Sequence, residues 1–178
     1  DETGIWGYIS AVEELAVDMA RCDLQRTAIV HATGSGGTQA GLNAGVLLHD
    51  VPADVISYAV CDDEAYFNEK AQQDWDNLRA KRSDLPTKPI KTQTVDSYIG
   101  PGYGRAGSEV FDTLTELAAL EGIALDPVYT GKAFHGLIAD LEAGTFRSDA
   151  SDIIFVHTGG VFGIFPHASA VKAALDSE

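Results

Sequence analysis

Ten residues with the sequence TGSGGTQAGL, from Thr33 to Leu42, combine glycines and hydroxyl side chains in a pattern suited to binding an anion. They follow an apolar run and precede a stretch with helical spacing of apolar residues, so the glycines stand where a strand passes into a helix. The N–H groups at the start of a helix lack intrahelical acceptors, and the helix dipole adds positive charge there. Glycines let the backbone approach an anion closely, and hydroxyl groups add donors. We therefore predict a phosphate site formed by Gly34, Ser35, Gly36, Gly37 and Thr38.

Two common nucleotide-binding motifs do not match this stretch. The Lys-Ser/Thr pair of GxxxxGK[ST] is missing, so hydrolysis of a nucleoside triphosphate is poorly supported. Gln39 occupies the third glycine position of GxGxxG. The alternative to phosphate binding is a tight strand-to-helix turn with no ligand.

Two further loops carry side chains that can do chemistry. Thr158 lies in His157-Thr158-Gly159-Gly160, directly after an apolar strand, and its hydroxyl group could bond a heteroaromatic nitrogen; a plain turn explains the sequence equally well. Tyr103 stands between glycines in the segment 100–104, and Tyr129 lies in the segment 126–132. Tyrosines in loops have few neighbours to pack against, which favours function, and a phenol can transfer protons when a neighbouring charge lowers its pKa.

Alternating strands and helices must position these loops. Apolar runs and helical spacing predict strands at 27–32, 54–60, 92–95 and 153–156, and helices at 5–19, 38–48, 64–82, 110–120, 133–143 and 168–175. This order is typical of βαβ units and predicts one α/β domain with a mainly parallel sheet. Ligands then bind at the carboxyl ends of the strands, where the loops at Gly34 and Thr158 open on the same edge.

Composition narrows the class of protein. The 178 residues include 27 acidic and 12 basic side chains, for a formal net charge of −15, which argues against a nucleic-acid partner. No apolar run approaches the roughly 20 residues that cross a bilayer. The two cysteines are predicted to be buried free thiols in a reducing, cytoplasmic setting, and the histidines show no metal-ligand spacing, so no metal is expected. His31 and His157 are interpreted as hydrogen-bonded structural residues, and Trp75 as partly exposed.

Four motifs in register carry a resemblance to a known family. The segments TGSGGTQAGL, DSYIGPGYG, LDPVYTGKAFHGL and FVHTGGVFGIF resemble, in order and spacing, the D-cysteine desulfhydrase and aminocyclopropane-carboxylate deaminase family, from about Trp6 to Pro166. The resemblance implies the tryptophan-synthase-β-like fold, in which pyridoxal phosphate lies between a large and a small α/β domain. Residues 1–178 would form the C-terminal part of the three-layer large domain, and the complete protein would be a homodimer.

The resemblance also implies roles for the site residues. The segment from Gly34 to Thr38 would cradle the cofactor phosphate, Thr158 would face the pyridine nitrogen, and Tyr103 and Tyr129 would contact the amino-acid substrate and transfer protons. Thr130, at a substrate-binding position, stands where the deaminases carry Glu. This difference favours desulfhydrase-type β-elimination, which gives pyruvate, ammonia and sulfide from a cysteine-like amino acid. Aminocyclopropane-carboxylate deaminase and cysteate sulfo-lyase activities remain alternatives.

One element of the family pattern is missing. Family members hold the cofactor as a Schiff base on a lysine in an N-terminal Asn-Lys-x-Arg-Lys stretch, which this sequence lacks. The chain begins at Asp1, and we expect a missing N-terminal half to supply the small domain and that lysine. Alone, the chain is expected to be inactive and to fold poorly. Lys132 is the one lysine beside a site motif, and it is expected to be solvated. The alternative is a non-catalytic module that binds a phosphate-bearing ligand.

Overall fold

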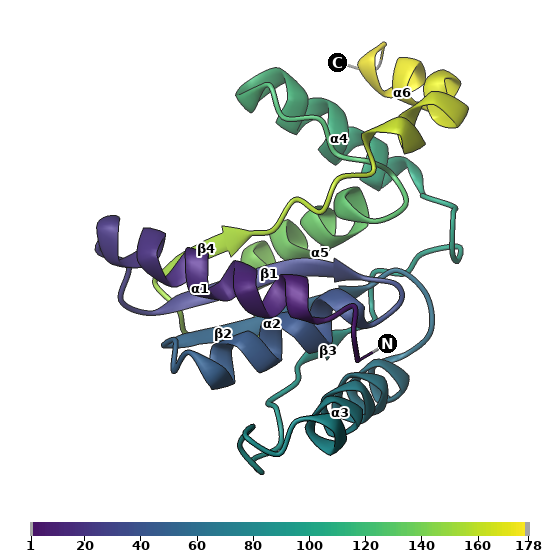
Figure 1. Cartoon of the computed structure of the whole chain (residues 1–178). Coiled ribbons are helices and arrows are strands. Elements are labelled where there is room, and N and C mark those ends of the chain that lie inside the picture. Colours follow the sequence, from purple (N-terminus) through teal and green to yellow (C-terminus); the bar gives the residue numbers. More distant parts are fainter. Residues whose placement is uncertain (1, 177–178) are drawn as a thin grey trace.

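A four-stranded parallel sheet forms the centre of the molecule in the computed structural model, which describes residues 2–176 (Figure 1). The strands are β1 (Thr27–Thr33), β2 (Ala53–Ala59), β3 (Thr94–Val95) and β4 (Asp152–Phe155), in the order β3-β2-β1-β4. Ile29 in β1 aligns with Val55 in β2 and with Ile154 in β4. Parallel pairing requires crossovers, and the helices between the strands provide them.

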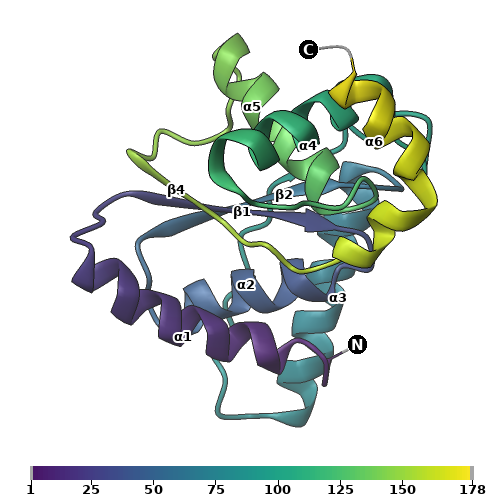
Figure 2. The ribbon, with the colours of Figure 1, turned by 90° about the horizontal axis from the view of Figure 1, so that it is seen from above.

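Helices cover both faces of this sheet (Figure 2). The elements are α1 (Trp6–Arg21), α2 (Gly37–Leu48), α3 (Glu64–Lys81), α4 (Ser108–Glu121), α5 (Thr130–Ala143), the 3-10 helix η1 (Val161–His167) and α6 (Ala168–Leu175). α1 and α2 lie on one face and α5 on the other, while α3 packs on α2, and α4 packs on α5 and α6. The predicted three-layer α/β architecture is confirmed.

Side chains of the strands alternate between two apolar cores. Ile29 and Val55 pack with Val12 of α1 and Leu42 of α2 on one face. On the opposite face Val30, Ile56 and Tyr58 pack with Ala133 and Leu137 of α5. All seven residues of β1 are buried, because helices cover both sides of this central strand.

The predicted elements agree with the structure to within a few residues at their ends, but some predictions of burial were wrong. Trp75 is fully buried, and its indole N–H donates to the carbonyl oxygen of Lys88 at 2.9 Å. Cys22 is exposed and Cys61 partly exposed. The 3-10 helix η1 was not predicted.

No helix within residues 2–176 is both long and apolar enough to span a membrane. No group of three or more His, Cys, Asp or Glu side chains in this part of the chain is arranged to hold a metal ion.

Candidate functional site

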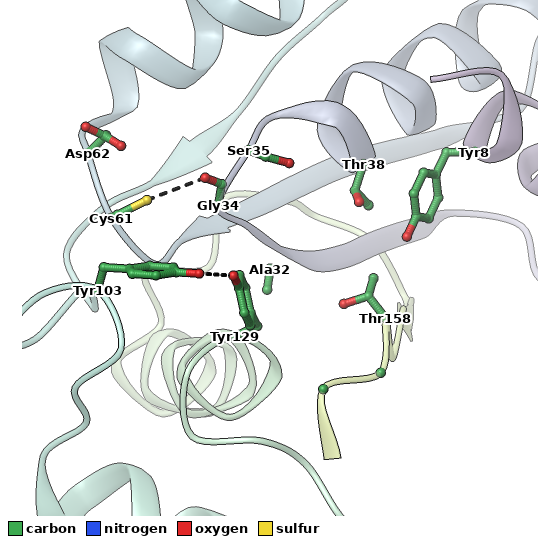
Figure 3. Close-up of a pocket in the computed structure, with 12 residues that line it drawn as sticks. Tyr8, Ala32, Gly34, Ser35, Thr38, Cys61, Asp62, Tyr103, Tyr129 and Thr158 are labelled. Atoms are coloured by element: carbon green, nitrogen blue, oxygen red, sulfur yellow. Dashed lines mark hydrogen bonds between the residues drawn. The ribbon is translucent and has the colours of Figure 1, made fainter. Parts of the chain in front are cut away.

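The predicted site residues meet at a cavity of about 690 Å³. It opens at the carboxyl ends of β1 and β2, where parallel sheets bind ligands (Figure 3). Its lining residues are Tyr8, Ala32, Gly34, Ser35, Thr38, Cys61, Asp62, Tyr103, Tyr129, Thr158, Gly159 and Gly160. The loops at Gly34 and Thr158 therefore share one edge of the sheet, as predicted.

The glycine-rich loop needs glycine at specific positions. Gly36 caps α2 with φ of 80°, a left-handed conformation that glycine adopts without strain, and no side chain caps this helix. The first N–H groups of a helix have no intrahelical acceptors, and at α2 no capping side chain takes their place. At Gly34 a Cβ atom would lie 2.9 Å from Cε1 of Tyr129, so this backbone packs directly against the tyrosine. Ser35 is exposed and Thr38 half-buried, so both hydroxyl groups can reach a ligand.

Tyr103 and Tyr129 meet across the cavity through their hydroxyl groups (Figure 3). Their rings pack edge to face, with centroids 5.8 Å apart and planes at 77°. The hydrogen bond with Tyr103, followed by burial, raises the pKa of Tyr129 to about 12. The structure thus does not lower the pKa of Tyr129, the condition under which a neighbouring charge would make a phenol a better acid. Tyr129 therefore stays protonated at neutral pH.

Thr130 lies behind the cavity wall. It is fully buried, and its hydroxyl group donates to Oδ1 of Asp126 at 2.7 Å and accepts from the backbone N–H of Asp126 at 3.0 Å. Asp126 also accepts hydrogen bonds from the backbone N–H groups of Val128, Tyr129 and Thr130, each at 2.8 Å. Thr130 therefore contributes to holding Tyr129 in place, and in this arrangement it makes no contact with the cavity.

Thr158 lines the cavity from a loop that His157 braces. Nδ1 of His157 accepts from the N–H of Gly159 at 3.0 Å, so Nε2 carries the proton and donates to the carbonyl oxygen of Ala124 at 2.9 Å. His31 is fully buried between the carbonyl oxygen of Ala32 and the hydroxyl group of Ser57. Both histidines have the hydrogen-bonded, structural contacts that the sequence analysis assigned to them.

Sequence reasoning missed several cavity residues. Tyr8 lies within the predicted helix 5–19 and was not singled out. Cys61 and Asp62 directly follow the predicted strand 54–60, and a strand's carboxyl end is itself a signal for a ligand site. The thiol of Cys61 faces the carbonyl oxygen of Gly34, and burial raises its pKa to about 11, so the thiol stays protonated at neutral pH. Lys132, expected to be solvated, is buried and bonds the carbonyl oxygens of Ile99 and Gly102.

Comparison with known proteins decides the family. The family described as "Pyridoxal-phosphate dependent enzyme" matches residues 1–159. The chain belongs to this family. Its cofactor is pyridoxal phosphate, in agreement with the sequence prediction.

Relatives place the chain within this family. A putative 1-aminocyclopropane-1-carboxylate deaminase of Thermotoga maritima is 38% identical over 91% of the chain and 49% of the relative. The bifunctional D-cysteine desulfhydrase/1-aminocyclopropane-1-carboxylate deaminase of Arabidopsis thaliana, a mitochondrial protein, is 36% identical over 97% of the chain and 42% of the relative. A solved structure of an ACC deaminase homologue superposes with a TM-score of 0.84 at 30% identity, covering 98% of the chain and 51% of that structure. The chain thus spans about half the length of these relatives, and the predicted resemblance is confirmed.

The cavity of this member of the pyridoxal-phosphate-dependent enzyme family suits the cofactor. A volume of about 690 Å³ lies within the usual range for small-molecule sites. The uncapped start of α2, reached over a glycine in the left-handed conformation, suits a phosphate group. Gly34, Ser35, Gly36, Gly37 and Thr38 would hold the phosphate, and Thr158 would face the ring.

Proposed function

We propose that the complete protein is a desulfhydrase-type lyase that eliminates sulfide from a cysteine-like amino acid. The observation that carries this proposal is the hydroxyl contact between Tyr103 and Tyr129 beside the glycine-rich loop. It brings a protonated phenol to the same cavity as the proposed phosphate cradle. Elimination of cysteine with one water gives pyruvate, ammonia and hydrogen sulfide, and the departing sulfur needs a proton.

Different residues of the chain would bind the cofactor and transfer the proton. Pyridoxal phosphate, when bound, withdraws electrons from the α-carbon of an amino acid. The glycine-rich loop and Thr158 orient the cofactor, Tyr129 donates a proton to the leaving sulfur, and Tyr103 holds the hydroxyl group of Tyr129 in position. Thr130 carries a hydroxyl group where the deaminases carry Glu, and it lies outside the cavity, bonded to Asp126. This favours elimination over the ring opening of aminocyclopropane carboxylate, with cysteate sulfo-lyase activity as a further alternative.

The lysine that anchors the cofactor must come from elsewhere in this proposal. None of the six lysines lines the cavity, and the ammonium group of Lys132 is held by two carbonyl oxygens. We therefore assign the lysine and the small domain to a further segment of the same protein. Because no lysine lines the cavity, residues 1–178 alone also fit a second role, as a non-catalytic module that binds a phosphate-bearing ligand.

Borohydride reduction followed by mass spectrometry tests both readings. The full-length protein, incubated with pyridoxal phosphate and reduced, should carry a pyridoxyl group on a lysine outside residues 1–178. It should release pyruvate and sulfide from D-cysteine or L-cysteine faster than 2-oxobutyrate from aminocyclopropane carboxylate or sulfite from cysteate. A pyridoxyl group on Lys132 would refute the assignment of the lysine. A protein that binds pyridoxal phosphate but releases no product from these four substrates would support the binding module.

A further inference from the structure

Lys132 lies in the first turn of α5, with its ammonium group beneath the loop that carries Tyr103. The residue is 1% exposed, and Nζ donates to the carbonyl oxygens of Ile99 at 2.7 Å and of Gly102 at 2.8 Å. An ammonium group has three donors and no acceptor, so the two converging carbonyl oxygens satisfy most of its capacity. The lysine therefore ties two points of the loop to the helix.

The loop has little side-chain packing to keep its shape. Gly100, Gly102 and Gly104 have φ values of 65°, 115° and 72°, and a Cβ atom added at any of them would meet nothing within 4 Å. Tyr103 is 57% exposed. Ordering an open glycine-rich segment loses much conformational entropy. Charge-assisted hydrogen bonds from a buried ammonium group offset part of that loss.

We propose that Lys132 is a positioning residue that fixes Tyr103 against Tyr129. Tyr129 immediately precedes α5, and Lys132 is the third residue of that helix. The first turn of α5 therefore positions both tyrosines, Tyr129 directly and Tyr103 through the loop that Lys132 holds. Asp126 holds the backbone of Tyr129, and Lys132 holds the loop of Tyr103. The consequence for catalysis rests on the proposed lyase function, whereas the ordering of the loop does not.

The surroundings of Lys132 fit this role better than direct chemistry. Its side chain lines a separate cavity of about 90 Å³, together with Tyr98 and His135, and does not reach the larger cavity. Burial lowers the pKa of Lys132, while the two carbonyl oxygens favour the ammonium form by accepting its protons. An ammonium group held in this way is available neither as a nucleophile nor as a base.

Hydrogen exchange of the full-length holoenzyme tests the structural half of the proposal. In Lys132→Met, which keeps much of the side-chain volume, the amides of residues 99–105 other than Pro101 should exchange at least about 10-fold faster than in the wild type. The matched control Lys88→Met removes an exposed lysine and should leave their exchange unchanged. Unchanged exchange in Lys132→Met would overturn the proposal, whether or not the protein turns over any amino acid.

Amine rescue covers the case in which Lys132→Met does not fold. Lys132→Ala should enlarge the 90 Å³ cavity enough to admit propylammonium. Folding or refolding in propylammonium chloride should restore slow exchange of residues 99–105, whereas tetramethylammonium chloride at the same concentration should not. Equal effects of the two salts would overturn the proposal.

A double-mutant cycle tests the catalytic half. If Lys132 acts through Tyr103, Lys132→Met and Tyr103→Phe should each lower kcat by about 10²-fold with little change in KM. The double variant should then lose at most about 3-fold more than Tyr103→Phe alone. Losses that multiply would show that Lys132 acts on something other than Tyr103. An inactive wild type would refute the proposed lyase and leave the exchange test intact.

Discussion

The buried carboxylate of Asp126 accepts a hydrogen bond of 2.8 Å from the backbone N–H of Tyr129. A Cβ atom at Gly160 would lie 2.8 Å from Oδ1 of the same carboxylate, so the loop that carries Thr158 packs against Asp126 as well. Two walls of the cavity therefore take their position from a residue that does not line it. Local sequence gives little sign of this, because an aspartate before Pro127 reads simply as a turn residue.

Asp126→Asn should destabilise the full-length protein by about 2–4 kcal/mol, because a buried acceptor of charge-assisted hydrogen bonds is lost and an amide N–H₂ must face backbone donors. The midpoint of urea unfolding should fall, while the slope with urea concentration should stay the same. Asp112→Asn, at an exposed position in α4, serves as the control and should change stability by less than about 0.5 kcal/mol. Equal stability of the two variants would refute this role of Asp126.

Gly36→Ala should weaken binding of pyridoxal phosphate. Alanine in the left-handed conformation costs about 1–2 kcal/mol, and its Cβ would lie 3.0 Å from Cγ of Lys70. The loop can relieve this strain by turning its N–H groups away from the phosphate, so the dissociation constant should rise about 10-fold, measured by absorbance titration of the apoenzyme. Gly7→Ala in α1 has open space around the new methyl group and should bind with wild-type affinity. Wild-type affinity in Gly36→Ala would contradict the assignment of the loop as the phosphate cradle.

His31 should make the fold sensitive to acid. Burial lowers the pKa of His31 to about 4, below its ordinary value of 6.5, so the unfolded chain binds the proton first as the pH falls. The stability contributed by neutral His31 is therefore fully present above pH 6.5 and is lost between pH 6.5 and about 4, by about 3 kcal/mol in total.

His31→Gln removes this proton linkage. Urea unfolding at pH 7 and pH 4 should show the stability difference between wild type and variant narrowing toward low pH. His49→Gln, at an exposed position, should keep a constant difference from wild type. If the unfolding free energies of His31→Gln and wild type differ by the same amount at pH 7 and at pH 4, His31 does not account for the acid sensitivity.

The sequence was sufficient to predict features that depend on local pattern. The glycines at 34–37 and the strands at 27–32 and 54–60 carry their own signals, because turn chemistry and apolar periodicity act over a few residues. Parallel pairing then places Gly34 and Thr158 at one edge without further information.

Features that depend on contacts between residues far apart in the chain could not be predicted from the sequence. Lys132 reads as a surface lysine until the carbonyl oxygens of Ile99 and Gly102, 30 or more residues away, are brought to it by the fold. Thr130 reads as a substrate contact until its helix turns the hydroxyl group toward Asp126. Trp75 lies on a polar helix, and its burial depends on packing against α1 and α2.

The exposed aromatic residues of η1 give the last prediction. Phe162 and Phe165 are 80% and 73% exposed, with ring centroids 6.2 Å apart. Adjacent exposed apolar side chains, unlike single ones, are typical of a surface that another segment or molecule covers. The isolated chain 1–178 should therefore bind the dye ANS strongly and melt without a cooperative transition. Replacing both residues by Ser should reduce ANS fluorescence, because the binding surface is removed. A cooperative melt of the isolated, monomeric chain with little dye binding would show that η1 needs no cover and that these residues fold independently.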